Sequence, residues 1–303
     1  MNRRLLLLRK DVLFQFRRSA SNVNRKTPFE YCVDLVRTHD YENYLCMLLL
    51  PKDTRTAGLV IRAFNVEVAH VEDQVHDKKI GEMRFQFWVN ALKDTFNKNP
   101  PRSPVMMELH KVLCKHNLSK RHFKRLIESR RQHLSSAMSI DMASMETYAE
   151  YSVSPIYYLL LELHGLSNLK TDHAASHLGK AHGIVTLLRS VPYNARNRVN
   201  VLPQDILMKH NISEEAIVRR QINSGLQDAI CEVASTAKLH LDTAISLKKQ
   251  IGRSLNTIFL PIVCLETYLE ELRKLDFNIF HQRLQEKSGL LPLRLLFRKF
   301  LSQ

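Results

Sequence analysis

The spacing of apolar residues constrains the fold of this 303-residue chain more than any other feature. Apolar side chains recur three and four residues apart, as in Leu159, Leu160, Leu163 and Leu166, and in Ile258, Ile262, Leu265 and Leu269. This spacing places them on one face of an α-helix. Only 8 Gly and 10 Pro are spread over the chain, and alternating Val, Ile and Thr runs are scarce. The sequence therefore predicts an all-α fold.

The chain is long enough to bury a full hydrophobic core. Residues 28–285 contain no internal repeat, no low-complexity tract and no shift in composition, which favours a single helical domain over that range. Within the helix expected over 141–165, Pro155 is predicted to end or kink the helix, because proline lacks the backbone N–H. Helices are expected over residues 28–50, 54–76, 82–97, 141–165, 172–190, 213–249 and 254–274.

The N-terminal segment carries nearly half of the net charge of +15. Residues 1–29 hold eight basic residues and one acid, and the remaining chain has a net charge of only +8. An Arg-rich, acid-poor segment with Leu, Phe and Ser is typical of a mitochondrial transit peptide, which we expect over residues 1–27. The alternative is a basic tail on a protein that stays in the cytosol.

The C-terminal segment, residues 286–303, is short, apolar and basic. It is too short to span a bilayer, but an amphipathic helix of this kind can lie on an anionic membrane. The membrane contact would then involve Arg294, Phe297, Arg298 and Lys299. In the competing interpretation this segment is the last helix of the bundle, and its basic residues lie near the negative end of the helix dipole.

The cysteines and histidines do not predict a cofactor. The five cysteines are dispersed and include no C-x-x-C pair, which favours free thiols in a reducing compartment. His173 and His177 would share a helix face and suit zinc, but no third ligand has a fixed spacing to them, so surface histidines are expected. P-loop, G-x-S-x-G and G-x-G-x-x-G motifs are absent from the sequence.

Residues 178–203 carry the most informative pattern. They resemble the second metal-binding helix of squalene/phytoene synthases, which reads A-x-Q-x-x-N-I-L-R-D-V-x-E-D and is followed by Y-L-P. The two outer acids of that motif are replaced by Ser190 and Asn194, and its Glu by Tyr193. Mg²⁺ needs hard anionic oxygens as ligands, so these neutral side chains would bind it poorly. The frame of the motif is kept at Ala181, Leu188, Arg189, Val191, Ala195, Arg196, Leu202 and Pro203.

The first half of the family pattern is similarly degenerate. The motif Y-A-F-C-R-x-x-D-D-x-x-D aligns on Ala63-Phe64, which places Val66 at the diphosphate-binding Arg and Ala69 at the first Asp. Only the last Asp remains, as Asp73. Upstream, Asp40 and Glu42 occupy the positions of two small hydroxyl residues that hold phosphate in the family, and acids there would repel a diphosphate.

One pair of acids remains to be weighed. Asp73 and Asp77 are four residues apart, so on one helix they would share a face and could bind a single cation. The alternative is a solvated acidic face. The partner segment 190–194 offers no opposing carboxylate, and one half-site would not draw diphosphate away as it ionises. We therefore expect no metal site and no catalytic residue.

The resemblance covers roughly residues 28–285 and implies an isoprenoid-synthase-like helical bundle with a large central cavity. A non-catalytic mitochondrial branch of this family acts in early assembly of respiratory complex I, the NADH:ubiquinone oxidoreductase, at the matrix side of the inner membrane. The resemblance therefore implies a pseudoenzyme without a cofactor. Its expected partners are complex I subunits or other assembly factors, together with peripheral inner-membrane lipid.

Two other functions are weighed against this one. An active prenyl transferase would need the carboxylates that the second motif lacks. A nucleic-acid binder is suggested by the overall charge, but outside the N-terminal segment the excess is only +8 and no RNA- or DNA-binding motif is present. We therefore expect no nucleic-acid partner.

Overall fold

The computed structural model describes residues 26–75, 77–135, 141–286 and 288–301. These residues form helices joined by short loops, and no strand occurs among them. The prediction of an all-α fold is confirmed. The segment expected to be a transit peptide lies outside the described residues, except for its last two positions.

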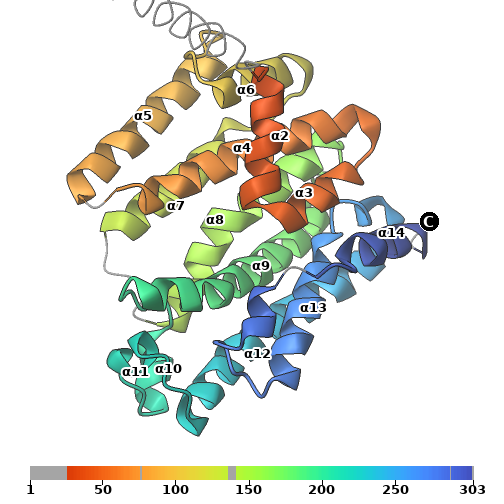
Figure 1. Ribbon diagram of the computed structural model, residues 1–303. Helices are drawn as coiled ribbons and strands as arrows, with labels where there is room; N and C mark the ends of the chain where they lie inside the picture. The colour runs from red at the N-terminus through yellow and green to blue at the C-terminus, as the bar shows by residue number, and fades with distance from the viewer. Residues whose placement is uncertain (1–25, 76, 136–140, 287, 302–303) are drawn as a thin grey trace, which may run out of the picture.

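The N-terminal half of the bundle is shown in red to yellow in Figure 1. Helix α4 runs through its centre, and α2, α6 and α7 pack around α4. The helices of this half are α2 (Pro28–His39), α3 (Tyr41–Leu48), α4 (Lys52–Asp73), α5 (Lys78–Phe96), α6 (Pro104–Lys115) and α7 (Lys120–Ser135).

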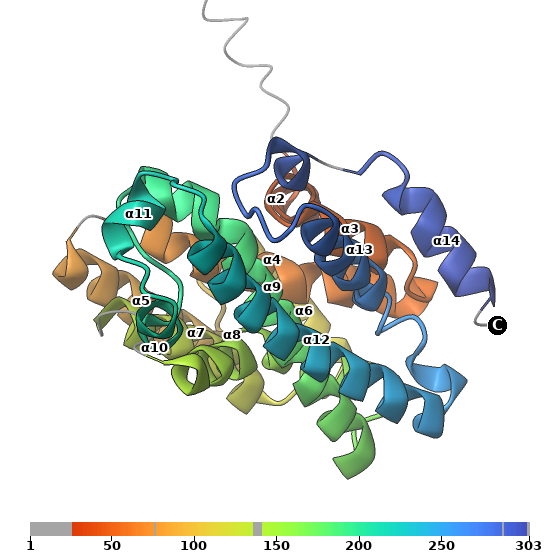
Figure 2. The same cartoon turned by 90° about the horizontal axis from the view of Figure 1, so that it is seen from below.

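The C-terminal half is built around the long helix α9, with α8 and α12 packed against it (Figures 1 and 2). Helix α13 contacts α3, α9 and α12, and α14 lies against α3 and α13. The elements of this half are α8 (Met142–Leu163), α9 (Leu169–Arg196), α10 (Gln204–Lys209), α11 (Glu214–Val218), α12 (Ser224–Ile251), η2 (Arg253–Leu255), α13 (Pro261–Lys274), η3 (Gln282–Gln285) and α14 (Leu291–Leu301).

Several helices begin where the local sequence provides a cap. Thr27 forms a capping box with Glu30 and is followed by Pro28, so α2 starts with its free N–H groups satisfied. Asn168 caps α9 through the N–H groups of Lys170 and Thr171. These caps fix where the two helices enter the bundle.

Some expected helix boundaries were wrong. The helix expected over 28–50 divides at Asp40, whose backbone (φ −141°, ψ 52°) is not helical. The helix expected over 213–249 divides into α11 and α12. Pro155 does not end its helix, because α8 continues to Leu163. Pro155 is buried inside α8, and the alternative expectation of a kink there stays a prediction.

Helices α8 and α9 approach each other closely at two glycines. A Cβ atom added to Gly179 would lie 2.6 Å from the Cα of Ser154, and one added to Gly183 would lie 2.6 Å from the Cα of Ala149. Only glycine allows the two backbones this separation. The contact fixes the position of the C-terminal half of α9, where the second family motif lies.

Helix α14 packs against the bundle through Leu291 and Leu295, which are buried. The side of α14 that carries these two residues is therefore packed, as expected if this segment is the last helix of the bundle. No helix among the described residues is long and apolar enough to cross a membrane.

Candidate functional site

A cavity of about 630 Å³ opens between the α2–α3 junction, α9, α13 and the segment that leads into α14. Its size is within the range of pockets that take small ligands or short peptide segments. Acidic, basic and hydroxyl groups mix with two tyrosines on its wall. The lining residues are His39, Asp40, Tyr41, Glu42, Asn43, His182, Thr186, Arg189, Cys264, Thr267, Tyr268, Glu271, Arg283, Leu284, Gln285, Glu286, Ser288, Leu290, Leu291 and Arg294.

Arg189 of α9 is held on the cavity wall by two partners. Its Nη1 donates to Glu42 Oε2 at 2.6 Å, and its guanidinium lies 4.5 Å from the centre of the Tyr268 ring. All three residues line the cavity. Arg189, which keeps the arginine of the second family motif, is therefore already paired with a carboxylate of the same chain.

Arg62 of α4 lies at the centre of the bundle, beneath one part of this wall. It is 2% exposed, and its Nη1 lies 3.5 Å from Asp40 Oδ2. The guanidinium also lies 5.9 Å from the centre of the Tyr157 ring. Its Nε and Nη2 have no hydrogen-bond partner in the protein. A buried guanidinium with so few partners is costly, so these groups require an explanation.

The charge of Arg62 influences the pKa values of His182 and Cys46. The Tyr157 hydroxyl is hydrogen-bonded to His182 Nδ1 at 2.7 Å. Burial, followed by the positive charges of Arg62 and Arg189, lowers the pKa of His182 to about 3, so this imidazole is neutral. A hydrogen bond with Cys264, followed by burial, raises the pKa of the Cys46 thiol well above its usual value.

A second cavity, of about 310 Å³, lies between α7 and the start of α8. Its wall includes His133 and Tyr148, whose rings are 4.6 Å apart, and Leu187 of α9. His133 Nδ1 lies 3.1 Å from Glu72 Oε1, at the end of the first motif. Burial, and then Glu72, raises the pKa of Tyr148. A neutral tyrosine and a paired histidine give this cavity no evident nucleophile.

The histidines considered for zinc take part in a different network. His177 Nδ1 lies 2.9 Å from His240 Nδ1, and His240 Nε2 lies 3.2 Å from Glu146 Oε2. The ring of His173 is 5.0 Å from that of His177. Within the part of the chain that the structure describes, no group of three or more His, Cys, Asp or Glu side chains is placed to hold a metal ion.

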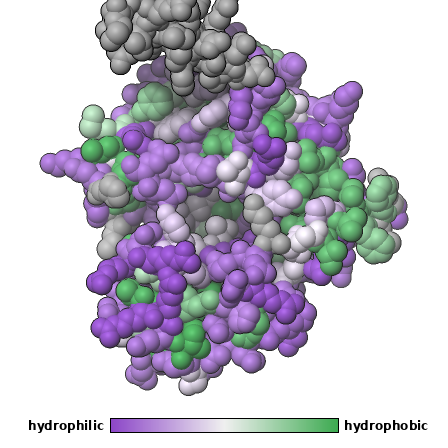
Figure 3. Space-filling view, in the orientation of Figure 1, coloured by the Kyte–Doolittle hydropathy of each residue, from purple (hydrophilic) through white to green (hydrophobic). Residues whose placement is uncertain are grey.

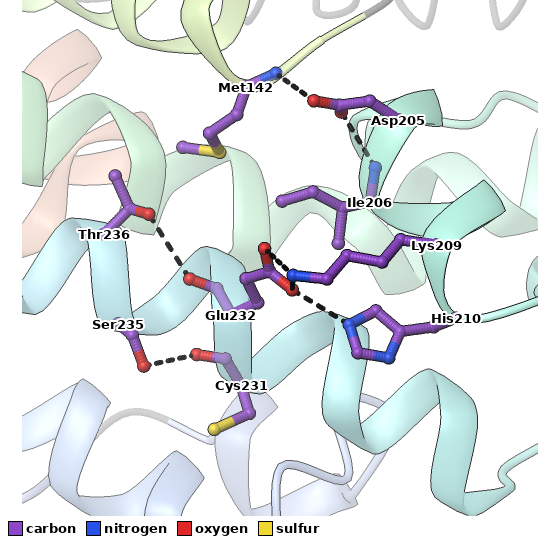
Figure 4. Close-up of polar contacts among 9 residues, drawn as sticks. All are labelled: Met142, Asp205, Ile206, Lys209, His210, Cys231, Glu232, Ser235 and Thr236. Carbon is purple, nitrogen blue, oxygen red and sulfur yellow. Dashed lines mark hydrogen bonds and ion pairs between the residues drawn. The ribbon is translucent and has the colours of Figure 1, made fainter.

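The cluster in Figure 4 joins α10 to α8 and α12. Asp205 accepts hydrogen bonds from the backbone N–H of Met142 at 3.4 Å and of Ile206 at 2.8 Å. Lys209 Nζ and His210 Nε2 each lie 2.9 Å from Glu232 of α12. These hydrogen bonds and ion pairs lower the pKa of Glu232. Each polar group here has a protein partner, so the cluster is best explained as a structural connection.

The outer face of α14 is apolar. Leu293, Phe297 and Phe300 are 63%, 65% and 65% exposed. Hydrophobic residues gather over this side of the molecule in Figure 3, at the position of α14 in Figure 1. Lys299 reaches inward and donates to the backbone oxygen of Leu49 at 2.9 Å, and Arg294 lies 3.4 Å from Thr267 Oγ1.

Comparison with known proteins agrees with this fold. The sequence model of the squalene/phytoene synthase family matches residues 36–288. The chain belongs to this family. A squalene synthase, HpnC from Alicyclobacillus acidocaldarius, has a crystal structure similar to this member, with a TM-score of 0.73 and 19% identity. That similarity covers 83% of this chain and 95% of the bacterial one.

More similar relatives within the family carry a different name. A human protein named "NADH dehydrogenase (ubiquinone) complex I, assembly factor 6" is 44% identical over 270 residues, covering 89% of this chain and 81% of the human protein. A homolog of the same name from Drosophila melanogaster is 38% identical over 281 residues, covering 90% of this chain and 84% of the fly protein.

The structure places the residues that were expected at the degenerate motif positions. Val66 is buried and Ala69 half-buried, and neither has a polar group to offer. The Ser190 hydroxyl donates to the backbone oxygen of Leu187, and the Asn194 amide donates to that of Ser190. The polar atoms that replace the second pair of acids therefore bind their own helix.

The acids considered as a residual cation site do not share a helix, so that premise was wrong. Asp73 ends α4, whereas Asp77 precedes α5 and accepts a hydrogen bond from the N–H of Lys79 at 2.7 Å. The carboxylate of Asp77 therefore caps α5. Tyr193 is 56% exposed and has no role in either cavity.

The sequence reasoning missed Arg62 and its neighbours. The available signal was a single arginine inside the apolar run Leu59–Phe64, because a charge in such a run is buried on a helix with no polar face. Spacing within one helix could not reveal that Asp40 and Tyr157 lie beside it, since neither belongs to α4.

Proposed function

We propose that this chain acts in the assembly of mitochondrial respiratory complex I and does not transfer prenyl groups. The assembly role is supported by the names of relatives that share 44% and 38% of their residues with it. The absence of catalysis is supported by the Arg189–Glu42 ion pair, which puts an internal carboxylate where the family pattern expects diphosphate. Complex I subunits or other assembly factors are the proposed partners, and an early step of assembly is the proposed stage.

Removing the protein from its cells tests the assembly role. We expect fully assembled complex I to fall on native gels, together with its NADH oxidation activity, while the other respiratory complexes keep their amounts. Expression of the intact chain should restore complex I. Unchanged complex I in cells that lack the protein would contradict the proposal.

The matrix side of the inner membrane is the proposed location. The N-terminal charge excess supports import, and the first 25 or so residues are expected to be removed. N-terminal sequencing of the protein from purified mitochondria measures this directly. A mitochondrial protein that keeps Met1, or a pool found in the cytosol alone, would contradict this location.

Helix α14 is the proposed contact with the membrane surface. Its exposed Leu293, Phe297 and Phe300 can enter the headgroup region, while Arg294 and Arg298 attract anionic lipid, at about 1 kcal/mol for each basic residue near the surface. Lys248 of α12 lies near Arg298, and burial, followed by the charge of Arg298, lowers its pKa. The positive charge fits a surface rich in anionic lipid.

Vesicle sedimentation tests this contact. Phe297→Ser should weaken binding to vesicles that contain cardiolipin, and high salt should release the unmodified protein. Leu239→Ser is the matched control, because Leu239 is 67% exposed on α12, outside the proposed contact. Equal binding by the two variants would place the membrane contact elsewhere.

A further inference from the structure

Helix α5 carries a row of apolar side chains on the face that points away from the bundle. Ile80, Met83 and Phe87 are 51%, 73% and 51% exposed. Their spacing of three and four residues places them on successive turns of one helix face. Single exposed apolar residues are common on protein surfaces, but three at this spacing match the pattern by which helices anchor to each other.

The opposite face of α5 holds this row in place. Phe85, Trp88 and Leu92 are buried in the bundle, where α5 packs against α7 and α6. The ring of Phe87 lies edge-on to the ring of Trp88, with 5.6 Å between the ring centres. The exposed aromatic ring is therefore positioned before any partner binds, which lowers the entropy cost of an association.

Two cations border the apolar row. At 3.6 residues per turn, Lys79 and Arg84 fall on opposite sides of it, each about 70° from its centre. Both are exposed, and Arg84 Nη1 donates to the neutral Gln74 Oε1 at 2.6 Å. Among the residues that the structure describes, no carboxylate forms an ion pair with either cation, so both charges are available to a partner.

The acids nearest to this row in the sequence are engaged elsewhere. The carboxylate of Asp77 accepts from the backbone N–H of Lys79 and caps α5. Glu82 forms an ion pair with Arg131 of α7. The border of the row is therefore positive. A second copy of the chain in the same contact would bring like charges together, whereas acids on a partner would be attracted.

The position of α5 distinguishes a protein partner from a membrane. Helices α5 and α14 lie on opposite sides of the molecule (Figures 1 and 2). If α14 contacts the membrane surface, as proposed above, α5 faces away from that surface. An apolar row with a positive border at this place is therefore best explained by a protein that approaches from the other side.

We propose that the α5 surface, formed by Ile80, Met83 and Phe87 and bordered by Lys79 and Arg84, docks an amphipathic helix of a partner protein. The apolar stripe of that helix is flanked by Asp or Glu. The proposal rests on the assembly role and on the membrane contact proposed above. The flexible Met83 side chain adapts to the apolar stripe, and the two cations select for the acids beside it.

Synthetic helices test this chemistry without knowledge of the partner. One peptide of about 18 residues has leucines at helical spacing with glutamates on both flanks, and its twin has lysine at each glutamate position. Fluorescence anisotropy measures the binding of both to the full chain. The glutamate peptide is expected to bind about tenfold more tightly, and its advantage should shrink as the salt concentration rises. Absence of binding by both peptides would overturn the inference.

Charge reversal separates the α5 surface from the overall positive charge of the chain. Lys79→Glu combined with Arg84→Glu should make the lysine peptide the tighter ligand. Lys52→Glu combined with Lys170→Glu is the matched control, since it changes the net charge equally at exposed positions outside α5. The control should keep its preference for the glutamate peptide. The same preference in both double variants would contradict a role for Lys79 and Arg84.

A pair of methionines tests the apolar row. Met83 and Met208 are 73% and 74% exposed, and Met208 lies on α10, outside the α5 surface. Met83→Ser should weaken binding of the glutamate peptide by about tenfold, whereas Met208→Ser should change it by less than about twofold. Neither change touches the core, so the unfolding temperatures should agree. Equal affinities of the two variants would contradict docking at Met83.

Two further measurements test the other occupants of this surface. Vesicle sedimentation of Met83→Ser should equal that of the unmodified chain, and a loss of vesicle binding would assign the surface to the membrane. Sedimentation velocity should show no dimer that Met83→Ser dissociates, and such a dimer would assign the surface to a second copy. Either of these results would overturn the docking of a partner helix.

A cellular measurement separates this inference from the assembly role. Met83→Ser, present at normal abundance, is expected to lower complex I assembly, and Met208→Ser is expected to leave it unchanged. Normal assembly with Met83→Ser would overturn the use of the α5 surface and leave the assembly role standing. Unchanged complex I without any of the protein would instead remove the assembly role.

Discussion

Arg189 and Glu42, 147 residues apart in the sequence, form an ion pair of 2.6 Å on the wall of the main cavity. Arg189 comes from the segment that resembles the second metal-binding helix of the squalene/phytoene synthases, and Glu42 is expected at a position where that family holds phosphate with a hydroxyl residue. The pair explains how the arginine is retained while the catalytic carboxylates are lost, because the cation has a permanent partner. A ligand diphosphate would have to displace Glu42 without the help of a metal.

The first prediction concerns this loss of chemistry. Incubation of the protein with farnesyl or geranylgeranyl diphosphate and Mg²⁺ should give no condensation product above a control without protein. The reason is that Ala69, Ser190 and Asn194 offer no carboxylate to hold Mg²⁺. Product that forms with the unmodified chain and disappears with Asp73→Asn would show that the protein is an enzyme.

The second prediction concerns the seam between α8 and α9. Gly183→Ala should destabilise the fold by roughly 1–3 kcal/mol, since the new methyl group meets the backbone of Ala149, which cannot move aside. Gly81→Ala is the matched control, because its methyl group meets the flexible end of Leu134. Urea unfolding of both variants measures the difference. A Gly183→Ala protein as stable as the control would show that the seam is not tight.

The third prediction compares the frame of the second motif with its polar remnants. Ala181 is fully buried, so Ala181→Asp places an unpaired charge in the core at a cost of roughly 3–5 kcal/mol, a large part of the stability of a domain. Ser190→Ala removes only a bond to the helix's own backbone, and its effect should remain within about 0.5 kcal/mol.

Protein abundance and complex I assembly in cells check this comparison. Ala181→Asp should reduce both, and Ser190→Ala should change neither. If Ser190→Ala abolished assembly at normal abundance, the remnant serine would have a direct functional role.

The fourth prediction concerns acid sensitivity. Burial, followed by the charge of His240, lowers the pKa of His177 to about 4, against an ordinary value of about 6.5. Between these two values the unfolded chain binds more protons than the folded one, so stability falls as the pH drops through this window. His177→Gln should reduce the slope of the unfolding free energy against pH. Part of this slope should remain in the variant, because the pKa of His182 is also lowered. Urea midpoints at pH 7, 6 and 5 check this, and an unchanged slope in the variant would exclude His177 as a source.

The sequence predicted the helical class and the family well, because periodicity and motif order are properties of the linear chain. It failed where a residue's partners come from other helices. Asp40 interrupts the first helix, and its carboxylate binds Asn43 and Arg62. Pro155 lies buried inside α8, although proline removes a backbone hydrogen bond of the helix.

The candidate site was predicted only in part. The sequence placed the motif positions by spacing alone, but the cavity wall that Arg189 shares with Glu42 depends on the packing of α13 against both α3 and α9. The two interpretations of the C-terminal segment were treated as alternatives. In the structure, Leu295 faces the bundle and Phe297 faces outward. One helix of eleven residues therefore packs on one side and exposes an apolar side chain on the other.

The position of α14 has a thermodynamic consequence. Leu291 and Arg294, in its first turn, line the cavity, whereas Phe297, about one turn beyond Arg294, lies on the exposed face. A ligand in the cavity and a surface bound at Phe297 therefore touch the same rigid segment. If binding of either one shifts this helix, it changes the affinity for the other. The ligand then alters the affinity for the surface by the same factor by which the surface alters the affinity for the ligand.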